Sequence, residues 1–270
     1  MSGTTTFKSL ELAGWSERAD AYDRFTAALT GQVIEPLLDA AGVGSGQDVL
    51  DLCCGTGLVT AAALERGARV TAVDFAPSMI EAARRKGLAA RFAVGDAEAL
   101  RLPDASFDRV VCNCGLFHLA DPDRAMAEAR RVLRPGGRFG WSTWCGPERS
   151  PMFRVVLEAV AAAGGADVGL PPAPPPFRLA EPTQAERAMQ AAGFARVTTA
   201  EVPAVLAWPL ASIVDFLDRA TVRVAMLLRA QEPAARRRIE ELIVGGLAAH
   251  AEGGTVQAPM PSLVVVGTLP

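Results

Sequence analysis

The sequence has no long apolar run and no recognisable export signal. None of its segments approaches the roughly 18 consecutive apolar residues that a helix needs to cross a bilayer. The opening segment, MSGTTTFKSLELAGWSER, has neither an apolar core nor a cleavage site. Half of the residues are apolar and 21% are charged, a composition that excludes disordered and fibrous chains. We therefore expect a soluble, globular, cytoplasmic protein that has no membrane partner.

Positive charge is not in excess, and the cysteines are not the even set that a disulfide framework needs. The chain has 27 Lys and Arg against 30 Asp and Glu, a formal net charge of −3, so no overall basic field gathers phosphates. Nucleic acid is therefore not an expected partner. The five cysteines lie within apolar runs, at positions 53, 54, 112, 114 and 145. This arrangement predicts reduced thiols.

Short apolar runs alternate with longer amphipathic runs from about residue 47 to residue 144. This alternation is typical of βαβ units around a parallel sheet. The expected strands are 47–52, 69–74, 90–94, 107–113 and 138–144, and the expected helices are 56–66, 77–86 and 122–133. Pro77 and Pro122 suit the first turn of a helix, and Pro135-Gly136-Gly137 is expected to stop the last one. We predict a doubly wound, Rossmann-like α/β fold.

The flanking segments predict helices and the remaining strands. Residues 15–41 are expected to form two helices broken near Thr30-Gly31, and residues 164–176 a surface crossing rich in Gly and Pro. Further helices are expected at 150–163, 183–192, 210–229 and 233–250, and strands at 194–202 and 262–269. These two strands complete a seven-stranded sheet with a terminal antiparallel edge strand, and the helices form cap insertions.

The most informative segment is Val49-Leu50-Asp51-Leu52-Cys53-Cys54-Gly55-Thr56-Gly57, a buried strand that runs into a tight turn and a helix. Small residues let the backbone approach a ligand there, and the start of the helix supplies free N–H groups. Alone, this turn fits dinucleotide, mononucleotide or other adenosyl ligands. Asp74 ends the second strand, where an acidic group accepts hydrogen bonds from ribose hydroxyls, and Asp96 ends the third.

Three carboxylates at successive strand ends, Asp51, Asp74 and Asp96, favour a cationic ligand over a pyrophosphate. The glycine spacing agrees, because Thr60 stands where a dinucleotide fingerprint has Gly or Ala. The charge argument thus favours S-adenosylmethionine over NAD and disfavours a nicotinamide oxidoreductase.

With these motifs, the sequence resembles the class I S-adenosylmethionine-dependent methyltransferases, in the branch that includes the ubiquinone and menaquinone biosynthesis methyltransferases. The resemblance covers about residues 47–144 and rests on four segments in order: VLDLCCGTG, VTAVDFAPSMIEAAR, VGDAEALRLPDASFD and ARRVLRPGGRF. It implies S-adenosylmethionine as the cofactor. One departure is Cys53, which stands where many members have the first glycine of the turn.

The resemblance also implies roles for individual residues. Residues expected to contact the methionine part are Asp51, Cys53, Gly55 and Gly57, with Asn113 near its amino group. Those expected at the ribose and adenine are Asp74, Phe75, Met79, Asp96 and Ala97.

His118, just beyond the fourth strand, is the candidate catalytic base, although a satisfied loop histidine remains an alternative. Trp15 and Tyr22 either close over the methyl site or belong to the core.

The first and fourth strands are neighbours in this fold, so Cys53 and Cys54 are expected to approach Cys112 and Cys114. Their spacing is not the C-x-x-C pattern of zinc sites, so we predict packing residues and no metal. The run Arg236-Arg237-Arg238 is interpreted as a solvated helix face.

The sequence therefore predicts a methyltransferase that acts on the O, N or C atom of a small-molecule acceptor. Apolar residues of the cap favour an apolar or aromatic acceptor, unless these side chains instead form the core of the cap. These residues are Phe153, Phe177, Trp208, Phe216 and Met226. The alternative is a protein of the same fold that binds S-adenosylmethionine for a different purpose. It would catalyse another reaction, such as a cyclisation, or serve as a non-catalytic subunit. We expect one domain, 1–270, with a helical lid (1–44), a cofactor-binding core (45–145) and a substrate cap with terminal strands (146–270). The oligomeric state stays open.

Overall fold

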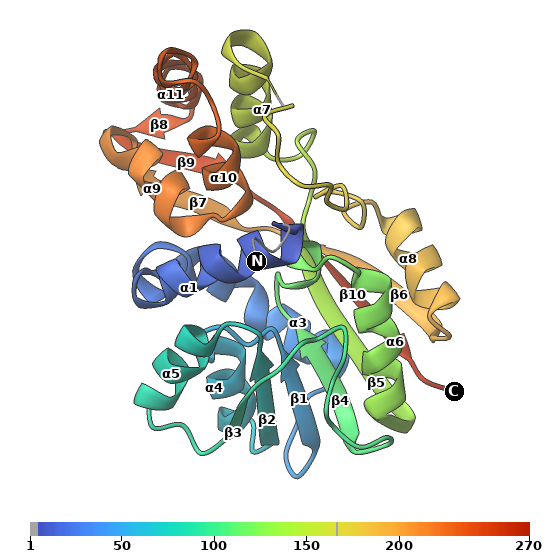
Figure 1. Ribbon diagram of the computed structural model, residues 1–270. Helices are drawn as coiled ribbons and strands as arrows, with labels where there is room; N and C mark the ends of the chain where they lie inside the picture. Colours follow the sequence, from blue (N-terminus) through green and yellow to red (C-terminus); the bar gives the residue numbers. More distant parts are fainter. Residues whose placement is uncertain (1–4, 166) are drawn as a thin grey trace.

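A seven-stranded sheet forms the lower half of the molecule in the computed structural model, which describes residues 5–165 and 167–270 (Figure 1). The strand order is β3-β2-β1-β4-β5-β10-β6. The strands are β1 (Asp48–Leu52), β2 (Arg69–Asp74), β3 (Arg91–Val94), β4 (Phe107–Cys112), β5 (Leu133–Trp144), β6 (Ala195–Val202) and β10 (Ser262–Thr268). The first five are parallel, whereas β10 pairs antiparallel with both β5 and β6.

The predicted doubly wound, Rossmann-like fold is confirmed, but the placement of the last strand was wrong. β10 is antiparallel as expected, yet it lies between β5 and β6, and β6 takes the edge. Its run Leu263 to Val266 is buried throughout, as a strand with a neighbour on either side requires.

Helices cover both faces of the sheet. One face carries α3 (Ile34–Ala41), α4 (Leu58–Glu65) and α5 (Pro77–Arg85), and the other carries α6 (Pro122–Val132) and α8 (Pro182–Ala191). Pro77 and Pro122 occupy first-turn positions as predicted. The triplet at 135–137 does not stop a helix, because α6 ends at Val132 and β5 begins at the next residue.

The N-terminal segment begins its helix earlier than the sequence indicated. Helix α1 spans Phe7–Phe25. Its N-cap residue is Thr6, whose hydroxyl accepts a hydrogen bond from the Ser9 N–H in a capping box. The chain then forms α2 (Ala27–Thr30) and a 3₁₀ turn (Gly31–Val33) before α3, so the predicted break near Thr30-Gly31 is present. Residues 1–4 of the predicted lid and residue 166 of the predicted crossing lie outside the described residues.

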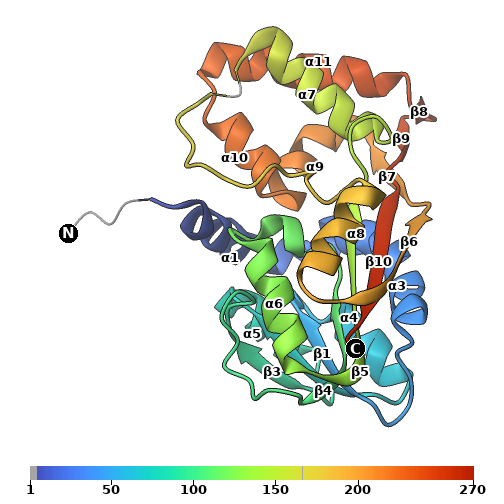
Figure 2. The ribbon, with the colours of Figure 1, turned by 90° about the vertical axis from the view of Figure 1, so that its right-hand side faces the viewer.

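Two insertions form the cap above the sheet (Figures 1 and 2). The first, after β5, contains α7 (Pro151–Ala163), and the second, between β6 and β10, contains the rest. Its elements are β7 (Val205–Pro209), a 3₁₀ turn (Leu210–Ser212), α9 (Ile213–Ala220), α10 (Arg223–Arg229), α11 (Pro233–Ala248), β8 (Ala251–Glu252) and β9 (Thr255–Pro259). The predicted helix at 210–229 is two helices, separated at Thr221 and Val222.

The cap is not wholly helical, which corrects the prediction from the sequence. Strands β7, β9 and β8 form a separate three-stranded antiparallel sheet. Gly253 and Gly254 turn between β8 and β9 with φ of +56° and +80°, which favours glycine. These strands are too short to give a periodic signal of their own.

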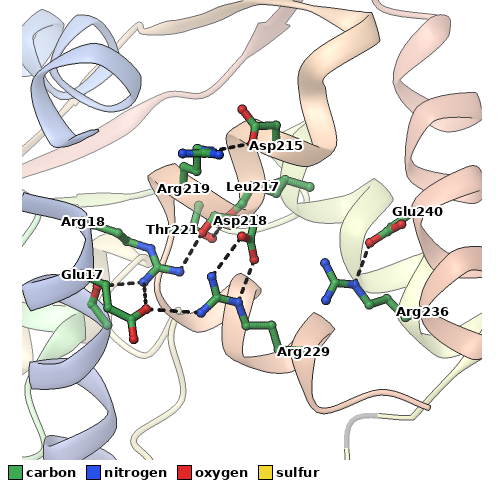
Figure 3. A network of polar contacts seen from close by, with 11 residues as sticks. Glu17, Arg18, Asp215, Leu217, Asp218, Arg219, Thr221, Arg229, Arg236 and Glu240 are labelled. Carbon is green, nitrogen blue, oxygen red and sulfur yellow. Dashed lines mark hydrogen bonds and ion pairs between the residues drawn. The ribbon is translucent and has the colours of Figure 1, made fainter. Parts of the chain in front are cut away.

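Helix α1 lies between the sheet and the cap (Figures 1 and 2). On the cap side, Arg229 pairs with Asp218 and with Glu17 of α1, and Arg18 donates to the Asp218 carbonyl (Figure 3). On the sheet side, Asp20 pairs with Arg85 of α5. None of the helices in the described residues is both long and apolar enough to span a membrane.

Glycines in two helices should respond oppositely to alanine. A Cβ at Gly14 of α1 would lie 2.5 Å from Cγ1 of the buried Val222, whereas nothing lies within 4 Å of one at Gly245 of α11. Gly14→Ala should lower the free energy of unfolding by about 1 to 3 kcal/mol, because Val222 is stiff and tightly packed. Gly245→Ala should raise it by about 0.5 to 1 kcal/mol. Denaturant titrations of both variants check this, and a stabilised Gly14→Ala would contradict the packing of α1 on the cap.

Candidate functional site

The turn after β1 is shaped by three residues with positive φ. Cys53 has φ +58°, Gly55 +53° and Gly57 +84°. Cys53 thus occupies a left-handed conformation that favours glycine, at the position where the family resemblance expects one. A Cβ at Gly55 would meet only the Tyr22 ring, at 3.9 Å. The side of the turn that faces α1 is therefore bare backbone under an aromatic ring.

Two predicted site carboxylates, Asp51 and Asp74, are buried beside this turn. Asp51 accepts a hydrogen bond of 2.6 Å from the Thr60 hydroxyl. Asp74 accepts from the backbone N–H groups of Gly55 and Ala76, both at 2.9 Å. Burial raises the pKa of Asp51 to about 7 and that of Asp74 to about 6. Because burial disfavours the charged form, a cation or further hydroxyl donors from a ligand would lower both pKa values.

The predicted adenine and ribose residues lie under α1. Met79 is buried, and Phe75 packs against it together with Trp15 and Tyr22 of α1. The remaining predicted residues of this group, Asp96 and Ala97, follow β3, and Ala97 is buried.

Asp96 is already engaged by α1. Lys8 forms ion pairs with Asp96 at 2.5 Å and with Glu98 at 2.8 Å, between the Nζ atom and the carboxylate oxygens. The Oδ1 atom of Asp96 also accepts from the Glu98 N–H. The N-terminal turn of α1 is therefore fastened to the edge of the sheet where an adenine ring is expected.

Asn113 joins three segments of the chain. Its Oδ1 accepts from the Ser142 hydroxyl at 2.6 Å, and its Nδ2 donates to the Thr30 carbonyl at 3.1 Å. Both ends of the amide are therefore used in holding the end of α2 against β5. The Cys114 thiol also donates to Oδ1, at 3.8 Å, so a methionine amino group at this side chain would compete with these donors.

His118 lies in the short 3₁₀ turn Leu116–His118 after β4, between aromatic rings. The Trp15 ring meets it edge-on at 4.8 Å, and the Phe117 ring lies 4.3 Å away, between ring centroids. Its Nδ1 atom is 2.9 Å from Oε2 of Glu11, a fully buried residue of α1. The other Glu11 oxygen lies 3.3 Å from Nε of Arg223 in α10.

Sequence reasoning missed Glu11 and Arg223 as site residues. They are 212 positions apart, so no local pattern joins them. One signal was present, because Phe7, Glu11, Gly14 and Arg18 recur at the spacing of a single helix face. That face is buried in the structure. A carboxylate on a buried helix face requires a partner.

A cavity of about 200 Å³ opens beside His118, between the sheet edge and the cap. Trp15 and Tyr22 line it from α1, and both also pack against the buried Met79. The remaining walls come from the loop after β4, the end of β5, α7 and the segment that leads into α10, including Phe117, Cys114, Trp144, Phe153, Phe177 and Arg223.

The apolar cap residues expected at an acceptor divide into two groups. Phe153 and Phe177 line the cavity, with ring centroids 5.0 Å apart. Trp208 instead packs against Phe25 and Phe216, at 5.2 Å and 5.1 Å, at the junction of α1 with the cap. The cavity lining does not include Trp208 or Met226. Of the five predicted cap residues, the two that line the cavity therefore come from the first insertion.

The cysteines come together in part. A Cβ at Gly115 would lie 2.7 Å from both Cys112 Sγ and Cys53 Cβ, so these two residues flank it as predicted. Cys54 packs against Ala72 and Ile80 instead, and Cys114 binds Ser142. A hydrogen bond with Cys112, together with burial, raises the pKa of the Cys53 thiol. In residues 5–165 and 167–270, no group of three His, Cys, Asp or Glu side chains is placed to hold a metal ion.

A parallel sheet with a glycine turn and strand-end carboxylates at its carboxyl edge defines a class of proteins that bind a nucleoside-containing cofactor at that edge. Residues 50–140 match the family model described as a methyltransferase domain. The chain is similar to a malonyl-[acyl-carrier protein] O-methyltransferase of Serratia marcescens, 39% identical over 52% of this chain and 54% of that protein. It is also similar to a demethylmenaquinone methyltransferase of Renibacterium salmoninarum, 35% identical over 47% and 54%.

A solved structure agrees in fold. The phosphoethanolamine N-methyltransferase 2 of Haemonchus contortus, in complex with S-adenosyl-L-methionine, matches 99% of this chain and 61% of its own with a TM-score of 0.62 and 18% identity. The family model and these relatives identify residues 50–140 as a class I S-adenosylmethionine-dependent methyltransferase domain, as the motifs predicted, and S-adenosylmethionine is the cofactor of such domains. The chain spans about half the length of the two curated relatives described above.

The raised pKa of Asp51 makes its contribution to stability depend on pH. In the folded state the neutral acid is favoured, so this contribution is present at low pH and is lost as the pH rises through about 7. Asp51→Asn stays neutral, so its free energy of unfolding relative to the wild type should increase by about 2 to 4 kcal/mol between pH 5 and pH 9. Denaturant unfolding of the cofactor-free protein measures this difference.

The matched control is Asp48→Asn, at the other end of β1. Hydrogen bonds with Arg69 and Arg134 lower the pKa of Asp48, so its replacement should bring no gain in stability over this pH range. If Asp51→Asn gained equally at pH 5 and pH 9, the raised pKa of Asp51 would be wrong.

Proposed function

We propose that this protein transfers a methyl group from S-adenosylmethionine to a hydroxyl oxygen of a small, flat, apolar or aromatic molecule in small-molecule biosynthesis. The observation that carries the proposal is the His118 imidazole, held through Nδ1 by buried Glu11, on the wall of an apolar cavity. One of the curated relatives is named an O-methyltransferase, which supports transfer to oxygen.

The carboxyl edge of the sheet is the proposed cofactor site. S-adenosylmethionine supplies, when bound, an electrophilic methyl group on a positively charged sulfur. Buried Asp51 and Asp74 favour a ligand that brings positive charge and hydroxyl donors, and the bare turn at Gly55 leaves room for it. The residues assigned to the cofactor remain Asp51, Cys53, Gly55, Gly57, Asp74, Phe75, Met79, Asp96, Ala97 and Asn113.

In this proposal, each of three consecutive segments of the chain has its own role. Residues 45–145 hold the cofactor, residues 146–270 supply the acceptor cap and the terminal strands, and residues 1–44 form the lid. Trp15 supports this assignment, because its ring packs beside Phe75 and Met79 and also lines the cavity next to His118. The lid thus closes both sites at once.

Alignment within the cavity accounts for much of the proposed rate enhancement. Holding a nucleophile in line with its target in a dry site is worth up to about 7 to 11 kcal/mol. The walls beside His118 are the rings of Trp15, Phe117, Phe153 and Phe177, which suit a flat acceptor. Of the Asp, Glu, Lys, Arg and His side chains in the described residues, those that line the cavity are His118 and Arg223.

His118 is the proposed general base. With its proton on Nδ1, the imidazole donates to Glu11 and keeps a lone pair on Nε2 for the acceptor hydroxyl. The imidazolium that forms is stabilised by the buried Glu11 carboxylate. Glu11 is a positioning residue in this scheme, since it acts through His118.

His118→Ala should lower turnover by about 100-fold or more, while the affinity for S-adenosylhomocysteine stays within about twofold. The acid limb of the wild-type pH profile should be lost, because the group that must be deprotonated is gone. Formation of S-adenosylhomocysteine with a panel of phenols measures turnover, and calorimetry measures affinity.

The chain offers a matched control in its second histidine, His250, which lies beyond the end of α11 and does not line the cavity. His250→Ala should leave both quantities unchanged. A loss of less than about tenfold in His118→Ala would remove the base role. If S-adenosylmethionine is bound but no acceptor in the panel yields S-adenosylhomocysteine, the alternatives of a different reaction or a non-catalytic subunit would be favoured over methyl transfer.

A further inference from the structure

Arg223 has donors that the protein does not use. Its Nε atom faces Glu11, its Nη1 donates to the Pro174 carbonyl at 2.9 Å, and its guanidinium stacks on the Phe7 ring at 4.5 Å. Its Nη2 atom is buried and has no hydrogen-bond partner in the part of the chain that the structure describes. An unsatisfied buried donor destabilises the folded protein, and more so when the group is charged, so its retention requires a reason.

The position of Arg223 supplies that reason. Three side chains in the described residues have a buried polar atom without a partner, namely Arg18, Ser150 and Arg223. Of these three, Arg223 lines the cavity. Arg223 therefore belongs to the wall of the site where the acceptor is proposed to bind, whereas Arg18 and Ser150 do not.

The charges around the cavity favour an anionic oxygen. Among the residues that the structure describes, no Asp or Glu side chain lines the cavity. Glu11 is fully buried behind His118 and Arg223, and its charge is shared between them. A carboxylate in the cavity thus meets a guanidinium with unused donors and no carboxylate on the wall. Charge-assisted hydrogen bonds of this kind are about twice as strong as neutral ones.

The two side chains also lie side by side, because His118 and Arg223 bind the two oxygens of the same Glu11 carboxylate, at 2.9 Å and 3.3 Å. A small molecule in the cavity can therefore place a hydroxyl beside His118 and a second oxygen beside Arg223.

We propose that Arg223 is a specificity-determining residue that binds a carboxylate of the acceptor, adjacent to the hydroxyl that faces His118. This inference rests on the proposed function and narrows it to aromatic hydroxy acids. Arg223 holds this carboxylate through Nη2 while Nε keeps its contact with Glu11.

The test compares two ligands of similar shape, 2-hydroxybenzoate and 2-methylphenol, which differ by a carboxylate in place of a methyl group. Their affinities are measured by calorimetry on the full chain with saturating S-adenosylhomocysteine. The wild type should bind 2-hydroxybenzoate at least about tenfold more tightly than 2-methylphenol. In Arg223→Met the two affinities should come within about threefold of one another.

Arg238→Met is the matched control. Arg238 is exposed on α11, pairs with Glu241 and does not line the cavity, so this variant should keep the wild-type preference. If Arg223→Met alone fails to fold because Glu11 loses a partner, the double variant Glu11→Gln/Arg223→Met removes both buried charges and is held to the same expectation.

An absence of preference in the wild type, binding of neither ligand, or a preference that survives in Arg223→Met would each overturn the proposal. Methyl transfer is scored separately on the same samples. If the preference behaves as expected but neither ligand is methylated, the result counts against the proposed function and leaves the carboxylate site in place.

Discussion

The buried carboxylate of Glu11 is the contact on which the arrangement of this molecule depends. It lies on α1, yet its partners are His118 at the carboxyl edge of the sheet and Arg223 in the cap. Breaking a buried ion pair by removing one partner typically costs about 3 to 5 kcal/mol, because it leaves an uncompensated charge. The lid, the sheet edge and the cap are therefore fixed relative to one another through one side chain. The same contact forms the polar wall of the cavity.

The surroundings of α1 reinforce this contact from both sides. Lys8 holds its first turn to Asp96 and Glu98, and Gly14 allows the close approach of Val222 from the cap. Trp15 then lies between the predicted cofactor residues and the cavity. A ligand at either site thus meets the same helix, so the binding of cofactor and the closure of the acceptor cavity are expected to be linked.

The sequence predicts the sheet and its cofactor edge because those features depend on local pattern. The strand and turn at 49–57 and the acidic residues after β2 and β3 are contiguous signals, and their order along the chain carries the family resemblance. The cap was harder. Strands β7 to β9 are short, and β10 enters between β5 and β6 through pairings over 60 residues or more in the sequence. Glu11 and Arg223 were missed for the same reason, since their roles exist only through contacts between distant segments. The residue roles assigned to the cofactor remain predictions.

The central claim is that the cofactor edge and the cavity form one site, joined under α1. A crystal structure of the protein with S-adenosylhomocysteine tests it most directly. The account predicts the ribose at Asp74 and the sulfur at the opening between the Gly55 turn and the cavity, on the side of His118. A complex with the sulfur directed away from His118, or with the ligand bound away from the Gly55 turn, would contradict it.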